Sequence, residues 1–138
     1  GWALYAQSLG TELGLYADPY SQFGALNVEL WRAAALVVDT GLHAQGWSRQ
    51  RAGDYLRGNT ALGEADIAAE VERYVACPGQ ALADKIGQLK ILELRRRAEQ
   101  RLGERFDLRE FHEQVIGSGI LPLSVLETRI HRWIDARR

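Results

Sequence analysis

Four polar residues lie in the segment 19–44 at spacings that place them on one face of a helix. Glu29, Arg32, Asp39 and His43 are separated by three, seven and four positions, and residues spaced in this way are neighbours on a helical surface. Asp39 precedes His43 by one turn, so its carboxylate would orient the imidazole for acid–base chemistry or support a metal ligand. The alternative, which the residues alone favour, is an ordinary polar helix face with an i,i+4 pair.

A second candidate is the tripeptide Pro78-Gly79-Gln80, which interrupts two helical segments. The first N–H groups of a helix that starts here lack intrahelical partners, and a buried start of this kind binds a carboxylate or orients a polar ligand. Gln80, Asp84 and Gln88 continue one face of that helix. The alternative is a kink whose N–H groups are hydrated by water.

The remaining chemistry-bearing residues are few. A metal site needs three or four converging ligands, and the three histidines, His43, His112 and His131, neither lie four residues apart nor form an HExxH motif. We therefore predict no metal site built from this chain alone, and we expect His112 and His131 at the surface of short helices. Ser118 lies between two glycines without a preceding strand, which predicts a hinge and not a nucleophile. Cys77 is the single cysteine and cannot form an internal disulfide.

The elements that must position these residues are helices. Apolar residues recur at intervals of three and four, and no segment alternates as a strand does. We predict an all-α fold of six to seven helices, two of them long, in a single domain over residues 1–138. The expected segments are 1–14, 19–44, 48–56, 64–76, 79–102, 107–116 and 122 onward. Asp18, Ser48 and Asp107 are the predicted N-caps.

Composition excludes several classes of function. The 138 residues are 46% hydrophobic and carry a formal net charge of −1, which argues against a broad nucleic-acid or anionic-membrane footprint. The arginines of the segment 95–105 alternate with glutamates and predict a solvated helix face. No apolar run reaches 18 residues, so no membrane-spanning segment is predicted. The chain opens with apolar side chains, as the middle of a buried helix would, and this predicts a truncated domain. The alternative is a native terminus after removal of an initiator Met, which a small Gly1 permits.

Several motifs resemble a known bacterial family, the domain of unknown function 885. Gly1-Trp2-Ala3-Leu4-Tyr5 resembles the end of its motif Glu-Gly-Trp-Ala-Leu-Tyr. The other matching segments follow in the family's order: Glu29-Leu30-Trp31-Arg32, Val38-Asp39-Thr40-Gly41-Leu42-His43, Glu70-Val71-Glu72-Arg73-Tyr74, Pro78-Gly79-Gln80-Ala81-Leu82, Lys85-Ile86-Gly87-Gln88-Leu89, Leu94-Arg95, Phe106-Asp107-Leu108-Arg109, Phe111-His112, Gly117-Ser118-Gly119 and Pro122-Leu123.

The resemblance implies a fold related to the helical zinc peptidases, of which this chain is the C-terminal part. Full-length relatives hold zinc through HExxH-type histidines and a glutamate, all upstream of Gly1, and act on peptides. The resemblance implies that this chain retains one wall of the cleft and not the metal-binding half. The resemblance implies that His43 contacts the substrate or transition state with Asp39 orienting it, and that Gln80, Asp84 and Arg32 bind substrate. The chain alone is expected to be inactive.

Two positions depart from the family. Asp84 stands where many members have a tyrosine that would stabilise an oxyanion, and a carboxylate does not take that role unless its pKa is strongly raised. Cys77 replaces a usual tryptophan. Both departures put activity in doubt even for a longer form of the protein.

A non-catalytic helical module is the alternative function. Trp2, Tyr5, Trp31 and Trp47 are expected to be exposed in a truncated domain, and such apolar surface favours burial against a partner. The expected partner is a second copy in a symmetric dimer or the missing N-terminal half. The compartment, bacterial cytoplasm or periplasm, is left open by the sequence.

Overall fold

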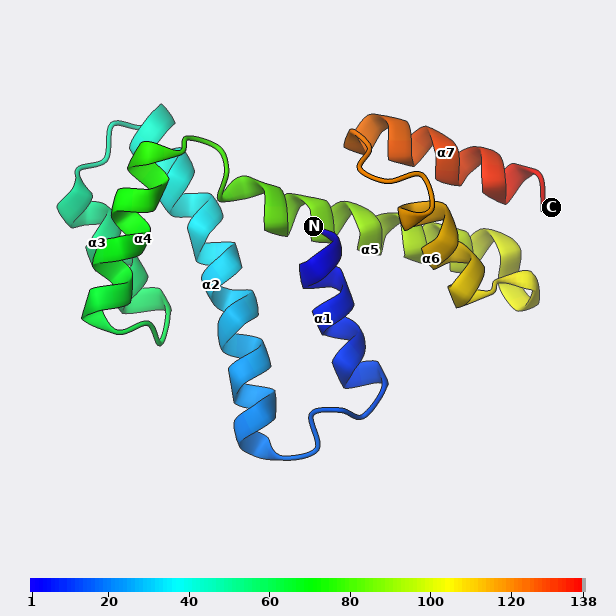
Figure 1. The fold of residues 1–138 in the computed structure, drawn as a ribbon, viewed down its shortest axis with the longest axis horizontal. Coiled ribbons are helices and arrows are strands. Elements are labelled where there is room, and N and C mark those ends of the chain that lie inside the picture. Colours follow the sequence, from blue (N-terminus) through cyan, green and yellow to red (C-terminus); the bar gives the residue numbers. More distant parts are fainter. Residues whose placement is uncertain (138) are drawn as a thin grey trace. The chain divides into compact units, whose positions relative to one another are not determined.

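A computed structural model describes residues 1–137, and every regular element in that range is helical (Figure 1). The α-helices are α1 (Trp2–Glu12), α2 (Pro19–Ala44), α3 (Arg49–Asn59), α4 (Glu64–Ala76), α5 (Leu82–Leu102), α6 (Leu108–Ile116) and α7 (Leu123–Asp135). One turn of 3-10 helix, η1 (Gly103–Arg105), follows α5. The prediction of an all-α fold with six to seven helices, two of them long, is confirmed.

Helix starts follow the predicted capping chemistry. The Asp18 carboxylate accepts hydrogen bonds from two backbone N–H groups in the first turn of α2, each at 3.0 Å, and Pro19 opens that helix. The Ser48 hydroxyl and the Asp107 carboxylate accept equivalent bonds in α3 and α6 at 3.2 and 2.9 Å. These side chains satisfy N–H groups that the helices leave unpaired.

Three predicted boundaries differ from the structure by two or three residues. The first helix ends at Glu12 and not at 14, and the third continues to Asn59 and not only to Leu56. The helix expected from residue 79 begins at Leu82, and the residues from Pro78 to Ala81 form turns. Gly79 has φ of +80°, which lies in the left-handed region and does not continue a right-handed helix. The interruption is therefore a turn between α4 and α5 and not a helix start.

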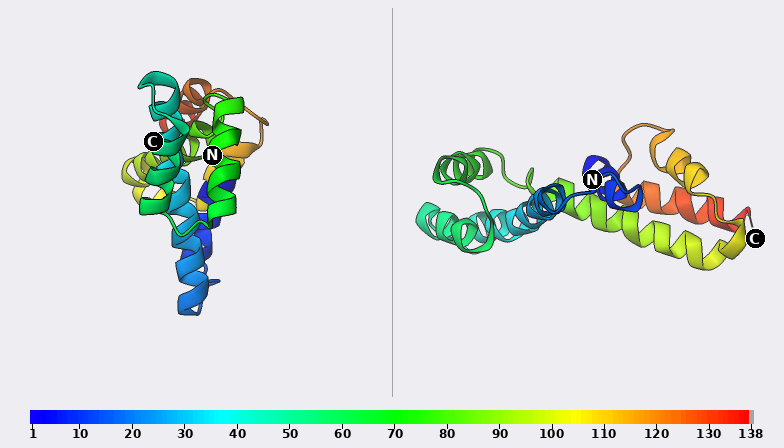
Figure 2. Two further views of the ribbon diagram at one scale, coloured as in Figure 1. Left: turned by 90° about the vertical axis from the view of Figure 1, so that its left-hand side faces the viewer. Right: turned by 90° about the horizontal axis from the view of Figure 1, so that it is seen from below.

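The described chain divides into two compact units, residues 1–86 and 87–138, and each is described by itself. In the first unit, α2, α3 and α4 lie side by side (Figures 1 and 2). Their core consists of Ala34, Ala35, Val38, Ala52, Leu56, Ile67, Val71, Tyr74 and Ala81. The small side chains on α2 let the neighbouring helices approach closely. The expectation of a single domain stays a prediction.

The second unit contains the rest of α5 with η1, α6 and α7. Its largest buried side chains come from all three α-helices: Ile91, Leu94, Leu102, Phe111, Leu126, Ile130, Trp133 and Ile134. The rings of Phe111 and Trp133 lie 6.3 Å apart, centroid to centroid, within the range of favourable aromatic pairing. No helix among residues 1–137 is both long and apolar enough to cross a bilayer.

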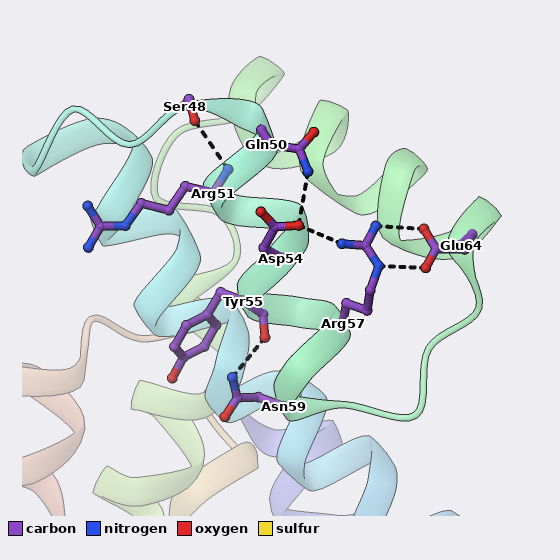
Figure 3. Close-up of polar contacts among 8 residues, drawn as sticks. All are labelled: Ser48, Gln50, Arg51, Asp54, Tyr55, Arg57, Asn59 and Glu64. Carbon is purple, nitrogen blue, oxygen red and sulfur yellow. Dashed lines mark hydrogen bonds and ion pairs between the residues drawn. The ribbon is translucent and has the colours of Figure 1, made fainter.

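A polar network on the surface of α3 fixes the connection to α4 (Figure 3). Asp54 accepts hydrogen bonds from Gln50 at 2.9 Å and from Arg57 at 2.6 Å. Arg57 also donates two 2.7 Å bonds to Glu64 at the start of α4, and these bonds lower the pKa of the Glu64 carboxyl. Because all of these groups are exposed, the network defines loop geometry more than it adds stability.

The expectation of exposed aromatic residues is wrong for Tyr5, which is 0% exposed. Trp2, Trp31 and Trp47 are half-buried. Trp47 packs on Gly41, whose missing side chain leaves room for the indole. His112 and His131, expected at the surface, are also partly buried. The exposed large apolar residues of the first unit are instead mostly leucine and phenylalanine on α2 and the loop before it: Leu13, Leu15, Tyr20, Phe23, Leu26 and Leu30.

Candidate functional site

The polar face of α2 contacts one continuous segment, residues 74–85, through four pairs in antiparallel order. The pairs are Glu29 with Lys85, Arg32 with Asp84, Asp39 with Gly79, and His43 with Tyr74. The predicted common face of Glu29, Arg32, Asp39 and His43 therefore exists as a contact surface. Each residue meets a partner within the chain.

Asp39 is the buried member of this series. Its side chain is 2% exposed, and both carboxylate oxygens lie 3.1 Å from the backbone nitrogen of Gly79. The carboxylate thus binds the turn between α4 and α5, where the sequence predicted that a carboxylate would be held. That carboxylate belongs to the chain itself.

His43 is exposed and has a different partner. Its Nε2 lies 3.0 Å from the carbonyl oxygen of Tyr74. A carbonyl only accepts, so Nε2 carries the hydrogen and Nδ1 is the nitrogen that accepts a proton. Asp39 and His43 therefore have separate hydrogen-bond partners. No hydrogen bond between them supports the interpretation in which Asp39 orients His43. His43 borders a cavity of about 490 Å³ next to Trp47 and Arg49.

A hydrogen-bond network connects α2, α4 and the turn after α4. The Trp31 indole donates to the Tyr74 hydroxyl at 3.2 Å, and that hydroxyl is bonded to Glu70. Arg73 donates to both oxygens of Glu70, at 3.0 and 2.6 Å, and to Oε1 of Gln80 at 2.9 Å. Because Arg73 is only a donor, Oε1 of Gln80 is its acceptor and Nε2 remains the donor that a ligand would meet.

Arg32 and Asp84, two of the predicted substrate-binding residues, form an ion pair. Arg32 Nη1 lies 3.4 Å from Asp84 Oδ2, and the side chains are 27% and 42% exposed. The Arg32 guanidinium also stacks 4.2 Å above the centroid of the Trp31 ring. The third predicted residue, Gln80, is exposed and contacts Arg73 instead. Arg32 lies on α2, and Gln80 and Asp84 belong to the segment that pairs with it.

Tyr74 is expected to ionise at a higher pH than an unperturbed tyrosine. Burial, together with the hydrogen bond to Glu70, raises the pKa of Tyr74 from 10.0 to about 12. The unfolded state releases this proton first, so the stability that Tyr74 contributes is present below pH 10.0 and is lost as the pH rises toward 12. A phenolate absorbance titration should resolve this late step, and Tyr74→Phe should remove it. If all tyrosines titrate together in the folded protein, the prediction is wrong.

Glu70 is expected to contribute to acid sensitivity. Burial alone would raise the pKa of its carboxyl, but hydrogen bonds from Arg73 and Tyr74 outweigh burial and lower the pKa below 4.5. A lowered folded pKa contributes stability that is present above the unfolded pKa and is lost as the pH falls through the folded value. Urea unfolding should therefore show Glu70→Gln less stable than the wild type at neutral pH, with the difference vanishing in acid. A difference that does not change with pH would contradict this assignment.

The residues described here do not fit a zinc site. Within residues 1–137 no group of three or more His, Cys, Asp or Glu side chains is placed to hold a metal ion. The Asp39 carboxylate and Nε2 of His43 are both bonded to backbone groups. Cys77 is exposed and free, and Ser118 accepts a hydrogen bond from Arg129. These residues therefore offer no site for a metal to take part in catalysis.

Glu70, Arg73 and Tyr74 form a part of the site that was not predicted from the sequence. The three residues lie at i, i+3 and i+4 on α4, which places them on one face. That spacing was available in the sequence. From the sequence, Tyr74 could equally be an ordinary core residue. Its hydrogen bonds to Trp31 and Glu70 became apparent only in the structure.

Comparisons with known proteins agree on one relationship. The family model described as "Bacterial protein of unknown function (DUF885)" matches residues 1–130. The crystal structure of a protein from Colwellia psychrerythraea, provisionally described as a lipoprotein, superimposes with a TM-score of 0.95 at 49% sequence identity. The match covers 98% of this chain but only 23% of that protein. No curated protein matches the chain.

Proposed function

Because this chain belongs to the family of bacterial proteins of unknown function (DUF885), we propose that it forms part of a larger peptidase-like protein. In this proposal the chain supplies one wall of a peptide-binding cleft. The observation that carries it is the antiparallel series of polar contacts between α2 and residues 74–85. This series holds Arg32 on α2 beside Asp84 on α5, and Arg73 holds Gln80 in the turn before α5, as a preorganised binding wall requires.

Each wall residue has a defined role in the proposal. Gln80, held through Oε1 by Arg73, donates from Nε2 to a peptide carbonyl. Asp84, which forms an ion pair with Arg32, accepts from a peptide N–H or an ammonium group and does not stabilise an oxyanion. His43 contacts the substrate through Nδ1, the nitrogen that its bond to Tyr74 leaves available.

The catalytic metal is the part of the proposal that this chain does not supply. Zinc, where the longer protein binds it, would be held by residues outside residues 1–138 and would activate water for attack on a peptide carbonyl. The chain alone is therefore proposed to be inactive. The description of the Colwellia psychrerythraea relative as a lipoprotein supports a place for the longer protein in the cell envelope.

A peptide-cleavage assay tests the proposal. The 138-residue chain should not cleave a defined peptide mixture with or without added Zn²⁺, whereas the product of the complete reading frame should cleave it in a chelator-sensitive manner. Within that longer product, Gln80→Ala should lower kcat/KM by about tenfold, the loss of one hydrogen bond. Gln100→Ala, an exposed position on α5, is the matched control. Cleavage by the chain alone, or a longer product without chelator-sensitive cleavage, would reject the proposal.

Self-association is the second candidate function, and the exposed apolar residues favour it. Leu13, Leu15, Phe23, Leu26 and Leu30 are between 51% and 71% exposed, and exposed apolar surface of this kind is often an interaction site. Sedimentation equilibrium should then find a dimer that Leu26→Glu dissociates. A monomer at every concentration tested would exclude this alternative.

A further inference from the structure

The second unit contains a basic groove between α6 and α7 that the proposed function does not use. The groove has a volume of about 810 Å³, which is in the size range of small-molecule sites. It is lined by residues of α7, by Gln114 of α6 and by the loop that joins the two helices. Arg129 and Arg132 line it, and no Asp or Glu does.

Arg129 is a fixed part of this groove. Its Nε donates to the carbonyl oxygen of Gln114 at 2.8 Å, and its Nη1 donates to the Ser118 hydroxyl at 2.5 Å. These bonds hold the loop against α7. A guanidinium has five donors, so Arg129 keeps donors for a ligand after making both bonds.

Arg132 provides the charge that the protein leaves uncompensated. It lies one turn after Arg129 on α7 and is exposed. Across the described chain it has neither an ion pair nor a hydrogen bond through its side chain. Two guanidinium groups without a lining carboxylate favour an anionic ligand, and a carboxylate matches the planar fork of arginine.

The apolar side of the groove restricts the ligand further. Leu121, Val125 and Trp133 line it beside the arginines. Trp133 is 9% exposed, and its indole Nε1–H is buried without a hydrogen-bond partner among residues 1–137. The indole ring therefore contributes apolar surface to the lining, whereas its N–H is buried beneath that surface.

From this combination we propose that the groove binds a small carboxylate that carries an apolar side group. The carboxylate pairs with Arg132 and the free donors of Arg129. The apolar group covers Leu121, Val125 and Trp133. An inorganic anion would pair with the arginines but would leave the apolar side of the groove uncovered.

NMR of the indole N–H groups tests the site directly. The chain has four tryptophans, and Trp133→Phe identifies the resonance of Trp133. N-acetyl-leucine should shift that resonance saturably, whereas N-acetyl-leucinamide, its uncharged match, should not. Inorganic phosphate should bind more weakly than N-acetyl-leucine.

A variant pair completes the test. Arg132→Gln should raise the Kd for N-acetyl-leucine by about tenfold or more, the loss expected for a charge-assisted hydrogen bond. Arg96→Gln, an exposed arginine on α5 that does not line the groove, should leave the Kd unchanged. The proposal is overturned by a shift that does not saturate, by equal binding of the amide or of phosphate, or by an unchanged Kd in Arg132→Gln.

Discussion

Asp39→Ala is expected to lower the free energy of unfolding by about 3 kcal/mol, since it removes a buried charged acceptor and leaves its donor unpaired. The carboxylate is 2% exposed and accepts the Gly79 N–H with both oxygens. Hydrogen bonds to charged groups in protein interiors stabilise more than neutral ones. Urea unfolding followed by circular dichroism measures the loss, and the Gly79 amide should exchange faster with solvent.

Two further variants separate the structural role of Asp39 from a catalytic one. Asp39→Asn keeps an acceptor oxygen of the same reach and should cost about 1 kcal/mol. His43→Ala removes an exposed side chain and should change stability by less than about 0.5–1 kcal/mol. If Asp39→Ala unfolds at the same urea concentration as the wild type, the turn does not depend on this carboxylate.

The helices could be predicted because their boundaries depend on local chemistry. α2 and α4 begin and end where the sequence predicts, since Asp18 and Pro19 start α2 and the Cys77-Pro78 pair follows α4. The start of α5 was misplaced by three residues. The Pro78-Gly79 pair is a local turn signal, in keeping with the left-handed φ of Gly79. The Gly79 N–H is also bonded to Asp39, forty residues earlier, and periodicity carries no information on that contact.

Of the candidate site, the sequence predicted only the polar face of α2 and not the residues that contact it. The spacing of Glu29, Arg32, Asp39 and His43 correctly places them together, because the period of a helix is fixed. Their partners come from residues 74–85, and the pairing order follows from how the end of α4 and the turn after it lie against α2. Spacing on one helix therefore suggested an Asp39–His43 pair, whereas tertiary packing gives each residue its own partner.

The difference between spacing on one helix and tertiary packing also explains why the aromatic residues were wrongly expected to be exposed. Tyr5 and the tryptophans were expected at the surface because a truncated domain exposes apolar groups. Trp31 and Trp47 instead pack within the first unit, where Trp31 bonds Tyr74 and Trp47 covers Gly41. Exposure depends on which small residue lies opposite a large one, and that pairing is not visible along a single helix.

Gly41→Ala is expected to destabilise the chain by about 2 kcal/mol, although alanine favours a helix more than glycine does. An added Cβ would lie 2.6 Å from Cε3 of Trp47, well inside van der Waals contact. The indole has little freedom to move away. The Trp47 backbone is bonded to the Gly41 carbonyl at 2.9 Å, and the Arg51 guanidinium lies 4.3 Å from the ring centroid.

Gly24→Ala on the same helix is the matched control with the opposite sign. No atom lies within 4 Å of its added Cβ, so only helix propensity acts, and stability should rise by about 0.5–1 kcal/mol. Urea unfolding of both variants measures the two effects, and the Trp47 indole N–H resonance should shift only in Gly41→Ala. If both variants are more stable than the wild type, Trp47 moves away from the added methyl group at little cost, and the prediction for Gly41→Ala is wrong.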